Sequence, residues 1–440
     1  MQIIIPTASL FDQVVGKQKS EENQVYRLMT YVLQYPVKDG VLLYHTLTCC
    51  LLLLTREEAS ILSAQRELID YWFLVPQHYD DQKLCRQVRQ LAQLFLPRAN
   101  TITDFNIVTT TACNAQCFYC FEKGTKPVTM TVATAKKVSD FIITNRGEEH
   151  VTINWFGGEP LVNSRIIDQI CLDLNRKGIP YSSTMVSNGY LFDAEMVKQA
   201  NELWRLTRVQ ITLDGTAQTY NRTKSYKNGD DTAFERVIQN IELLTASGIH
   251  VLVRLNAGTH NIEDLEQLVT FLHQRFEKNE KLSVYSHELL GSCYDCSNSQ
   301  LFEKRMQLDK LIADYGYSVN YKLPRELKVN RCMSDNDTMV LISPNGDLGK
   351  CEHYIDRDFF GHIDKAEKDE RIILKFKKRP EDIDACASCA YYPQCFRLLQ
   401  CPNGYYCTPE IQKENIHKIQ LAIKDEYQHY LTKLSNETLV

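Results

Sequence analysis

The sequence predicts an α/β protein built around a mainly parallel sheet. Between residues 103 and 290, short β-rich runs alternate with longer helical patterns. The predicted strands cover 105–110, 151–156, 182–188, 208–214, 250–256 and 281–289. The predicted helices cover 131–145, 163–176, 193–203, 232–247 and 262–277. Serial βα units form a parallel sheet with helices outside it, either doubly wound or closed as a complete or partial barrel.

The regions on either side of these units have a different composition. Apolar runs around a polar centre in Gly40 to Thr55 predict a hairpin, and helical patterns follow at 56–70 and 81–96. Beyond residue 290 cysteines dominate, and we expect a helix at 300–315, a hairpin near 338–351 and a charged helix near 410–434. The 440 residues are therefore divided into three predicted domains, 1–100, 101–290 and 291–440.

The composition is that of a soluble globular protein. The chain has 44% hydrophobic and 24% charged residues. A net charge of −5 and a pI of about 6.2 do not indicate a nucleic-acid partner. The sequence has neither an apolar run of membrane-spanning length nor the start of a secretion signal. We therefore expect a cytoplasmic protein without a membrane partner.

The cysteines are numerous for such a protein. There are 16, and a reducing cytosol disfavours structural disulfides, so metal ligation explains them better. Three lie at 113–120 and seven lie between Cys332 and Cys407. The scattered ones are interpreted mostly as small buried apolar residues; they are Cys49, Cys50, Cys85, Cys171, Cys293 and Cys296.

The first cysteine group has a C-x3-C-x2-C pattern, formed by Cys113, Cys117 and Cys120. It follows the first strand, and in parallel α/β folds ligands bind at the carboxyl ends of the strands. Three thiolates fit a [4Fe–4S] cluster in which one iron remains open to a small molecule. The alternatives are a zinc site completed by a distant residue, or buried thiols.

A second motif, Gly157-Gly158-Glu159-Pro160, follows the second strand. The glycines let backbone carbonyls approach a ligand closely. Glu159 is able to accept a hydrogen bond from a cationic amine, and Pro160 stiffens the turn. Alone, this motif is usually a tight turn; one strand away from the cysteines, it indicates an amine-binding loop.

Together these residues resemble the radical S-adenosylmethionine (SAM) superfamily. The resemblance covers Cys113, Cys117 and Cys120, with Phe118 and Tyr119 between the last two. It implies that Gly157, Gly158, Glu159 and Pro160 form the loop for the SAM amine, and that Ser187 and Asn188 contact its ribose and carboxylate. Asp214, in the Leu-Asp-Gly of 213–215, matches a fourth-strand motif. The implied fold is a partial (β/α)6 barrel.

The resemblance also implies a chemistry. SAM binds the open iron through its amine and carboxylate, and the cluster delivers one electron. SAM then breaks into methionine and a 5′-deoxyadenosyl radical, which abstracts hydrogen from an unactivated carbon. The protein orients the substrate and excludes competing reactions. An electron donor such as flavodoxin or ferredoxin is implied.

The C-terminal cysteines resemble a SPASM domain, which carries auxiliary clusters in peptide-modifying members of the superfamily. Gly346, five residues before Cys351, fits its G-x4-C hairpin. A zinc ribbon is the structural alternative. The resemblance assigns two auxiliary [4Fe–4S] clusters: the first to Cys332, Cys351 and Cys401, and the second to Cys386, Cys389, Cys395 and Cys407.

The resemblance implies eight cysteines for two closed clusters, and the segment from Cys332 to Cys407 has seven. Asp335, Asp337, Cys293 or Cys296 could supply the fourth ligand of the first auxiliary cluster. Otherwise its open iron could bind a thiolate of the substrate, which would suit thioether formation.

SPASM proteins mostly modify ribosomally made peptides. Residues 1–100 resemble a winged-helix-like leader-recognition module, to which a precursor leader adds a strand at the hairpin edge; the alternative is a packing domain. The predicted function is a peptide maturase that forms a thioether. Carbon–carbon crosslinking and epimerisation are close alternatives. Others are a formylglycine-forming enzyme like an anaerobic sulfatase maturase, and a zinc-stabilised scaffold without activity.

Overall fold

The computed structural model describes residues 1–19, 24–62, 66–95, 101–147, 150–289, 299–317, 322–327, 332–379, 382–395, 397–401 and 407–437. Its central element is a nine-stranded sheet in the order β12-β11-β10-β9-β8-β7-β13-β14-β15. Strands β7 to β12 pair in parallel, each with the next in the sequence. They are β7 (Asp104–Thr110), β8 (Val151–Gly157), β9 (Tyr181–Ser187), β10 (Leu206–Leu213), β11 (His250–Ala257) and β12 (Leu282–Glu288). The predicted strands and the α/β class are confirmed.

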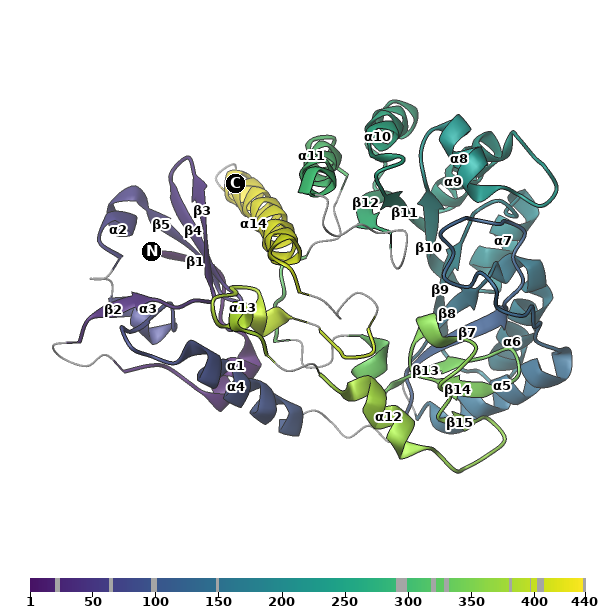
Figure 1. Ribbon diagram of the computed structural model, residues 1–440, viewed down its shortest axis with the longest axis horizontal. Helices are drawn as coiled ribbons and strands as arrows, with labels where there is room; N and C mark the ends of the chain where they lie inside the picture. Colours follow the sequence, from purple (N-terminus) through teal and green to yellow (C-terminus); the bar gives the residue numbers. More distant parts are fainter. Residues whose placement is uncertain are drawn as a thin grey trace.

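Helices cover the outer face of this sheet (Figure 1). They are α5 (Val132–Asn145), α6 (Ser164–Arg176), α7 (Ala194–Glu202), α8 (Ala217–Lys224), α9 (Ala233–Ala246) and α10 (Ile262–Phe276). Local capping fixes several of their starts: Asp193 accepts a bond from the Met196 amide, and Thr131 accepts one from Thr134. All of these helices except α8 were predicted from the sequence.

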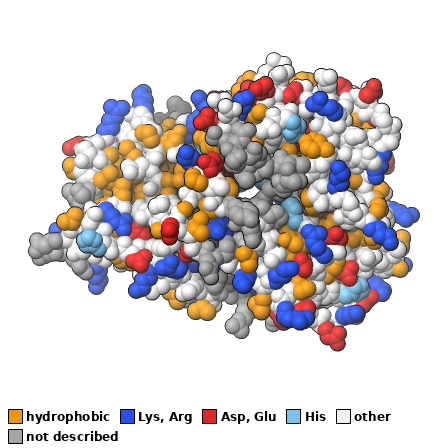
Figure 2. Space-filling view, in the orientation of Figure 1, with side chains coloured by type: hydrophobic (Ala, Val, Ile, Leu, Met, Phe, Trp, Pro, Cys, Tyr) orange, Lys and Arg blue, Asp and Glu red, His pale blue; other side chains and the backbone are white. Residues whose placement is uncertain are grey.

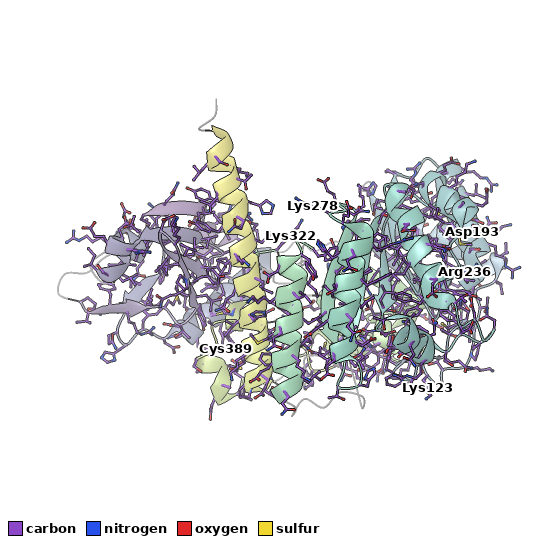
Figure 3. The ribbon with its side chains drawn as sticks, turned by 90° about the horizontal axis from the view of Figure 1, so that it is seen from above. Lys123, Asp193, Arg236, Lys278, Lys322 and Cys389 are labelled. Carbon is purple, nitrogen blue, oxygen red and sulfur yellow. The ribbon has the colours of Figure 1, made fainter. Side chains whose placement is uncertain are left out.

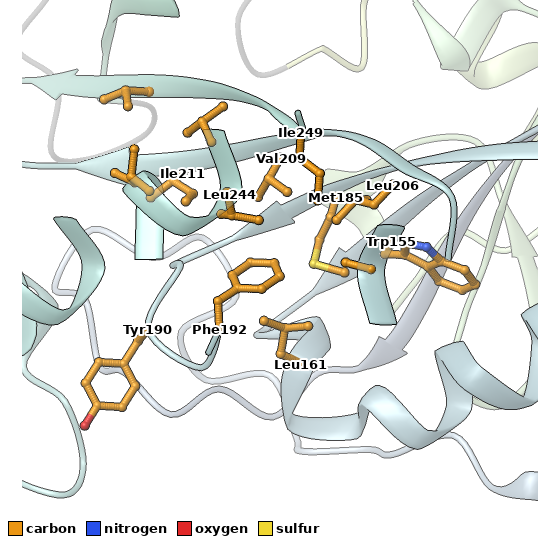
Figure 4. Packing of buried hydrophobic residues seen from close by; sticks show 14 of the residues in the cluster. Trp155, Leu161, Met185, Tyr190, Phe192, Leu206, Val209, Ile211, Leu244 and Ile249 are labelled. Atoms are coloured by element: carbon orange, nitrogen blue, oxygen red, sulfur yellow. The ribbon is translucent and has the colours of Figure 1, made fainter. Parts of the chain in front are cut away.

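The strands alternate between an apolar outer face and a polar inner face. Outward side chains such as Trp155, Met185, Val209 and Ile211 are buried beneath the helices. Figure 4 shows them packed with Leu244 and Ile249 and with other residues of the same cluster. Burial of the outer face anchors the helices, so the polar side chains of the same strands point into the barrel.

The C-terminal region extends the barrel sheet. Strand β13 (Met339–Ile342) pairs in parallel with β7, and β14 (Asp347–Gly349) and β15 (Gly361–His362) follow antiparallel. The predicted hairpin near 338–351 is thus confirmed. Its attachment to β7 was not predicted, because long-range strand pairing has no local signal.

Four helices complete this region: α11 (Ser299–Asp314), α12 (Glu370–Lys377), α13 (Asp384–Ala387) and α14 (Pro409–Glu437). Seen from above, α10, α11 and α14 lie side by side (Figure 3). At their junction Arg305 of α11 forms ion pairs with Glu288 at the end of β12 and with Glu414 of α14. The helices predicted at 300–315 and 410–434 are confirmed.

The N-terminal region contains a four-stranded antiparallel sheet in the order β1-β5-β4-β3 and a two-stranded sheet of β2 and β6. Its elements are β1 (Gln2–Ile5), α1 (Ser9–Val14), β2 (Tyr26–Leu28), β3 (Val32–Val37), β4 (Gly40–His45), β5 (Leu51–Thr55), α2 (Arg56–Ser60), α3 (Arg66–Asp70), β6 (Leu74–Pro76) and α4 (Asp81–Phe95). The predicted hairpin is confirmed as β4–β5. The helix expected over 56–70 is instead the two short helices α2 and α3.

One expectation about this sheet needs correction. The hairpin strands are interior, flanked by β1 and β3, so a leader strand has no free hairpin edge to join. One face of the sheet packs against α14, where Leu42 and Tyr44 meet Ile419 and Ile423. The N-terminal region is therefore packed against the C-terminal helix (Figure 1). Among the helices of the described ranges, none is both long and apolar enough to cross a membrane.

Candidate functional site

A cavity of about 560 Å³ lies on the inner face of the barrel strands. It is lined by alternate residues of β10 and β11: Arg208, Gln210, Thr212, Leu252, Arg254 and Asn256. The predicted cysteines Cys113, Cys117 and Cys120 line the same cavity, together with Gly157, Gly158, Ser187 and Asn188. The structure thus brings together residues from three predicted motifs.

Backbone hydrogen bonds hold the cysteine loop, residues 111–128, in place. After β7, the Thr111 amide donates to the Val128 carbonyl at 2.9 Å, which joins the two ends of the loop. Farther along, the Gln116 amide donates to the Lys224 carbonyl at 2.9 Å, and the Lys227 amide donates to the Asn114 carbonyl at 2.9 Å. The end of α8 and the residues after it therefore hold the cysteine loop over the barrel.

The surroundings of the three thiols disfavour the negative charge of a thiolate, so thiolates at these positions need a cationic partner. Burial, together with the nearby Glu159, Cys117 and Cys120, raises the pKa of the Cys113 thiol to about 12. Burial also raises the pKa values of Cys117 and Cys120, with the Lys224 ammonium opposing both shifts. Iron of a cluster would supply the positive charge that such thiolates require.

The donor set of three thiols on one cavity fits a [4Fe–4S] cluster with three cysteine ligands. Within the described ranges, no three His, Cys, Asp or Glu side chains converge on one metal position. A [4Fe–4S] cluster takes one thiolate per iron, so its ligands surround the cluster instead of meeting at a point. Cys113, Cys117 and Cys120 are the residues that would hold it.

The two glycines of the second motif allow close contact between two backbones. A Cβ at Gly157, whose φ is +127°, would lie 2.2 Å from the Thr110 carbonyl oxygen. A Cβ at Gly158 would lie 2.5 Å from the Ala112 carbonyl oxygen. The Gly158 amide donates to Thr110, and the Glu159 amide donates to Ala112, both at 3.0 Å. The motif therefore positions the segment that leads into Cys113.

Glu159 lies outside the lining of the cavity. It is fully buried, and its carboxylate accepts bonds from the Ser187 hydroxyl at 2.9 Å and the Asn188 amide at 2.8 Å. Burial raises its pKa to about 7, although these hydrogen bonds lower it. Its oxygens are occupied by protein donors, and it fixes the end of β9 instead of facing the cavity. Pro160 begins a buried 3-10 turn, η2 (Pro160–Asn163).

Asn188 links β9 to the cysteine loop. Its side-chain amide donates to Asn114 Oδ1 at 2.7 Å, and its backbone is held by Glu159. The Ser187 hydroxyl donates to Glu159 and accepts from the Gly189 amide at 3.0 Å. Both residues line the cavity, as a role in ligand contact requires, and both also hold its wall in place.

Asp214 belongs to a buried polar network that the sequence did not indicate. Its carboxylate pairs with the Lys224 ammonium at 2.9 Å and accepts from the Tyr119 hydroxyl at 2.8 Å. Asn256 donates to both Asp214 and Tyr119. Burial disfavours the charge on Lys224, but Asp214 and Tyr119 together raise its pKa above the usual value. Asp214 therefore holds a cation beside the cavity.

Lys224, Asn256 and Glu122 were missed in the sequence. Lys224 ends the unpredicted helix α8, so it had no element to be placed on. Asn256 and Arg254 lie at alternate positions of β11, and polar residues repeating every second position on a buried strand were the available signal. Glu122 lines the cavity, and burial raises its pKa to about 8.

Four C-terminal cysteines form one group. Burial, together with the nearby Cys395, Cys407 and Cys386, raises the pKa of the Cys389 thiol to about 11. Burial also raises the pKa of Cys407, and Cys395 and Cys386 add to that rise. These are the four residues that the sequence resemblance assigns to one auxiliary cluster.

A second group contains Cys332 and Cys351. Burial raises the pKa of the Cys351 thiol to about 12, and Cys332 adds to this shift. Tyr354 donates to the Gln400 carbonyl at 2.8 Å, which brings the segment of Cys401 toward Cys351. Asp335 accepts from the Cys332 amide and pairs with Arg379, and Asp337 pairs with Lys377. Cys293 and Cys296 lie outside the described residues.

The second group reaches the barrel cavity. Cys351 is followed by the short helix η5 (Glu352–Tyr354), and Glu352 and His353 line the cavity. The His353 ring lies 4.6 Å from the Phe121 ring of the cysteine loop. The candidate SAM site and the segment that follows Cys351 therefore meet at one cavity.

Comparisons with known proteins agree with this site. Residues 107–272 match the model of the radical SAM superfamily. An uncharacterised protein of Methanocaldococcus jannaschii is 25% identical over 262 residues, 59% of this chain and 88% of that protein. The radical SAM cyclopropyl synthase TigE of Paramaledivibacter caminithermalis is 22% identical over 264 residues, 55% of this chain and 52% of TigE.

Solved structures share the fold. The structure of anSMEcpe with bound AdoMet has a TM-score of 0.58 at 14% identity, covering 74% of this chain and 98% of that one. Streptococcus suis SuiB bound to precursor peptide SuiA has a TM-score of 0.52 at 13% identity, covering 88% of this chain and 100% of SuiB. These likenesses confirm the partial barrel. The family match identifies residues 107–272 of this chain as a radical SAM domain.

Proposed function

We propose that this enzyme is a SPASM-type maturase that joins a cysteine sulfur to a carbon of another residue in a ribosomally made precursor peptide. The observation that carries the proposal is the shared cavity of about 560 Å³. Cys117 lines it from the barrel side, and the neighbours of Cys351 line it from the C-terminal side. A peptide segment in this cavity would contact both regions.

The chain's own residues would position the reactants. When bound, the cluster and SAM supply a 5′-deoxyadenosyl radical that abstracts a hydrogen atom. Gly157, Gly158 and Glu159 hold the cysteine loop against β9. Lys224, held by Asp214, acts electrostatically on Cys117 beside the cluster site.

The thioether is supported by the first auxiliary group. Cys332, Cys351 and Cys401 offer three thiols for one cluster. Asp335 and Asp337 are held in ion pairs with Arg379 and Lys377, which makes them poor candidates for a fourth ligand. An iron left open there would bind the substrate cysteine as a thiolate. Two auxiliary clusters and an electron donor such as flavodoxin or ferredoxin belong to this proposal.

Carbon–carbon bond formation is the second candidate, because the relative TigE is named a cyclopropyl synthase. Joining two carbons also removes two hydrogens but leaves every thiol intact. A peptide substrate is supported by the neighbours: anSMEcpe was solved with a Cp18Cys peptide, and SuiB with precursor peptide SuiA. Epimerisation and formylglycine formation use the same machinery.

The N-terminal sheet is the proposed leader-binding element. Its outer strands are β1 and β3, and an extended peptide adds to an exposed sheet edge through main-chain hydrogen bonds. On the face seen in Figure 2, apolar side chains gather over this part of the molecule. A leader that joins β3 should slow amide hydrogen exchange in Val32–Val37. Slower exchange at β1 instead, or at neither strand, would contradict this docking mode.

Intact mass decides between the chemistries. The reduced, iron-reconstituted enzyme is incubated with SAM and a short cysteine-containing peptide encoded beside its gene, with Cys117→Ala as the inactive control. Loss of two hydrogens and of one alkylatable thiol is the expected result for a thioether. Loss of two hydrogens with all thiols alkylatable means a carbon–carbon bond. No mass change in ordinary water, together with uptake of deuterium in heavy water, means epimerisation.

Metal analysis of the same preparation tests the cofactors. Iron and acid-labile sulfide sufficient for three [4Fe–4S] clusters per chain are expected. Zinc without iron or sulfide would overturn the cluster assignment and leave a zinc-stabilised scaffold.

A further inference from the structure

Arg254 is a cavity residue with an unused hydrogen-bond donor. It points inward from β11, lines the cavity and is half-buried. Its Nε atom is buried and has no hydrogen-bond partner among the described residues. Buried polar groups normally have partners, so an unpaired guanidinium nitrogen in a cavity indicates that a ligand supplies the acceptor.

The nearest ring nitrogen does not satisfy Arg254. Its Nη2 lies 3.2 Å from His287 Nδ1, but the same nitrogen lies 2.7 Å from the Glu288 carbonyl. A carbonyl only accepts, so Nδ1 must carry the proton and cannot accept from Arg254. Burial and the Arg254 charge lower the pKa of His287 to about 3, which keeps the ring neutral. Arg254 faces it without a hydrogen bond.

No carboxylate of the described residues pairs with Arg254 within 4.0 Å. Burial raises the pKa of Glu352 and the Arg254 charge opposes that rise, but no ion pair within 4.0 Å joins the two side chains. The other cation near the cysteines, Lys224, is already bound to Asp214 and Tyr119. Arg254 is therefore a cavity cation without a counterion, whereas Lys224 has one.

Arg254 lies at a different depth in the barrel from the cysteine loop. Asn256, two residues later on β11, contacts Tyr119 of that loop. Two residues along a strand span about 6–7 Å, so the backbone of Arg254 lies deeper in the barrel than that of Asn256. There Arg254 is paired with Tyr285 of the adjacent β12. Tyr285 donates to Gln210 Oε1 at 3.0 Å and adds a polar wall there.

We infer that Arg254 anchors a carboxylate of the substrate, carried by an Asp or Glu side chain or by the peptide's C-terminus. A guanidinium presents parallel N–H donors that match the two oxygens of a carboxylate. The inference deepens the proposed function, which supplies the peptide that carries the carboxylate. It makes Arg254 a specificity-determining residue that selects an acidic position near the modified one.

Weak binding of small probes tests this without the native peptide. The SAM-loaded, reconstituted enzyme is titrated with N-acetylglutamate α-amide, N-acetylglycine and the neutral N-acetylglutamine α-amide, and binding is followed by saturation-transfer NMR. Bound SAM occupies its own carboxylate site, so the signal reports a second anion site. Preference for the glutamate probe indicates a side-chain carboxylate, and preference for N-acetylglycine indicates a chain terminus.

Arg254→Gln should weaken binding of the preferred carboxylate about ten- to a hundredfold. Arg254→Lys should lose part of the affinity, because it keeps the charge but not the paired donors. Arg208→Gln, which removes an exposed guanidinium lining the same cavity, is the matched control and should have little effect. SAM affinity and peptide-independent SAM cleavage should not change in Arg254→Gln.

Three results would overturn the inference. They are equal binding of neutral and anionic probes, equal losses in the Arg254 and Arg208 variants, and a loss of SAM affinity in Arg254→Gln. The last would assign Arg254 to SAM itself. Failure of the peptide-maturation assay alone would leave the carboxylate site standing, because the probe experiment does not use a peptide.

Discussion

The side-chain amide of Gln394 donates to the backbone carbonyl of Thr46 at 2.8 Å. The Thr46 hydroxyl in turn donates to the Ala390 carbonyl at 2.6 Å. These bonds fasten the turn of the β4–β5 hairpin to the loop between Cys389 and Cys395. Figure 3 shows Cys389 near the junction of the N-terminal region and α14. The N-terminal sheet thus supports the loop that is proposed to hold an auxiliary cluster.

Gln394→Ala should destabilise this junction. The buried Thr46 carbonyl would lose its side-chain donor, at a cost of about 1–3 kcal/mol. We expect a lower free energy of unfolding in urea and faster release of iron to a chelator from the C-terminal region. The exposed Gln218, replaced by Ala, is the control. Identical iron release in the two variants would mean that the hairpin does not support the cluster loop.

The contact between the N-terminal sheet and α14 also limits what a deletion of the N-terminal region can test. Deleting residues 1–100 would expose the α14 residues Ile419, Ile423 and Tyr427, which now pack against the N-terminal sheet. Such a variant is expected to misfold, so its inactivity would say nothing about leader binding. Hydrogen exchange on the full chain avoids this problem.

Gly158→Ala should disrupt the cysteine loop. The new Cβ would lie 2.5 Å from the Ala112 carbonyl oxygen, and a backbone atom cannot move aside as a flexible side chain can. We expect the reconstituted protein to lose iron at the radical SAM site and to lose SAM cleavage. Gly361→Ala, whose Cβ would meet its nearest atom at 3.4 Å, is the control. Normal SAM cleavage in Gly158→Ala would contradict the close approach of the two loops.

The Asp214–Lys224 pair should behave non-additively. Asp214→Asn leaves the fully buried Lys224 without its counter-charge, which typically costs about 3–5 kcal/mol of stability. The double variant Asp214→Asn/Lys224→Met removes both charges and should recover part of that loss. Urea unfolding of the single and double variants measures the difference. A double variant less stable than Asp214→Asn would mean that the two charges are not a pair.

Cys389→Ala tests whether SAM cleavage and peptide modification depend on different clusters. The residue belongs to the group of four C-terminal cysteines and not to the barrel cavity. Peptide-independent SAM cleavage should therefore persist, while peptide modification falls sharply. Both rates are measured on one preparation, as 5′-deoxyadenosine and as modified peptide. Equal loss of both would assign the C-terminal cysteines a mainly structural role.

Stability should fall in mild acid because of His45. Burial lowers the pKa of His45 from its usual 6.5 to about 4, and its Nε2–H donates to the Trp72 carbonyl at 3.0 Å. The unfolded chain therefore binds the proton more readily as the pH falls below 6.5, so stability present at neutral pH is lost toward pH 4.

His45→Gln removes this titration. Between pH 7 and pH 5 the wild-type protein should lose about 2 kcal/mol more unfolding free energy than the variant. Urea unfolding at the two pH values, with and without the substitution, gives the difference. Parallel pH dependences in the two proteins would remove His45 from the explanation.

The barrel elements were predictable because their signals are local. Each strand alternates apolar and polar residues, and helices such as α7 begin at a capping residue that is visible in the sequence. Helix α8 was missed because its eight residues, Ala217–Lys224, are mostly polar and give little helical periodicity. The Lys224 network was missed with it.

The residue types of the candidate site were predictable from the sequence, whereas the contacts between those residues were less so. The spacing of Cys113, Cys117 and Cys120 identified the cysteine loop, because such a motif lies within one short segment. The direction of Glu159 was not predictable, since it depends on donors from Ser187 and Asn188 on another strand. The sequence contains nothing local that ties these residues together.

By itself the sequence determined the order of strands and helices and the cysteine spacing. It also determined the polar inner face, because periodicity and short motifs act over a few residues. Only the tertiary structure decided that β13 joins β7, that Cys351 adjoins the barrel cavity and that Lys224 has a counter-charge while Arg254 has none. These outcomes depend on which distant segments meet, and packing of the whole chain determines that.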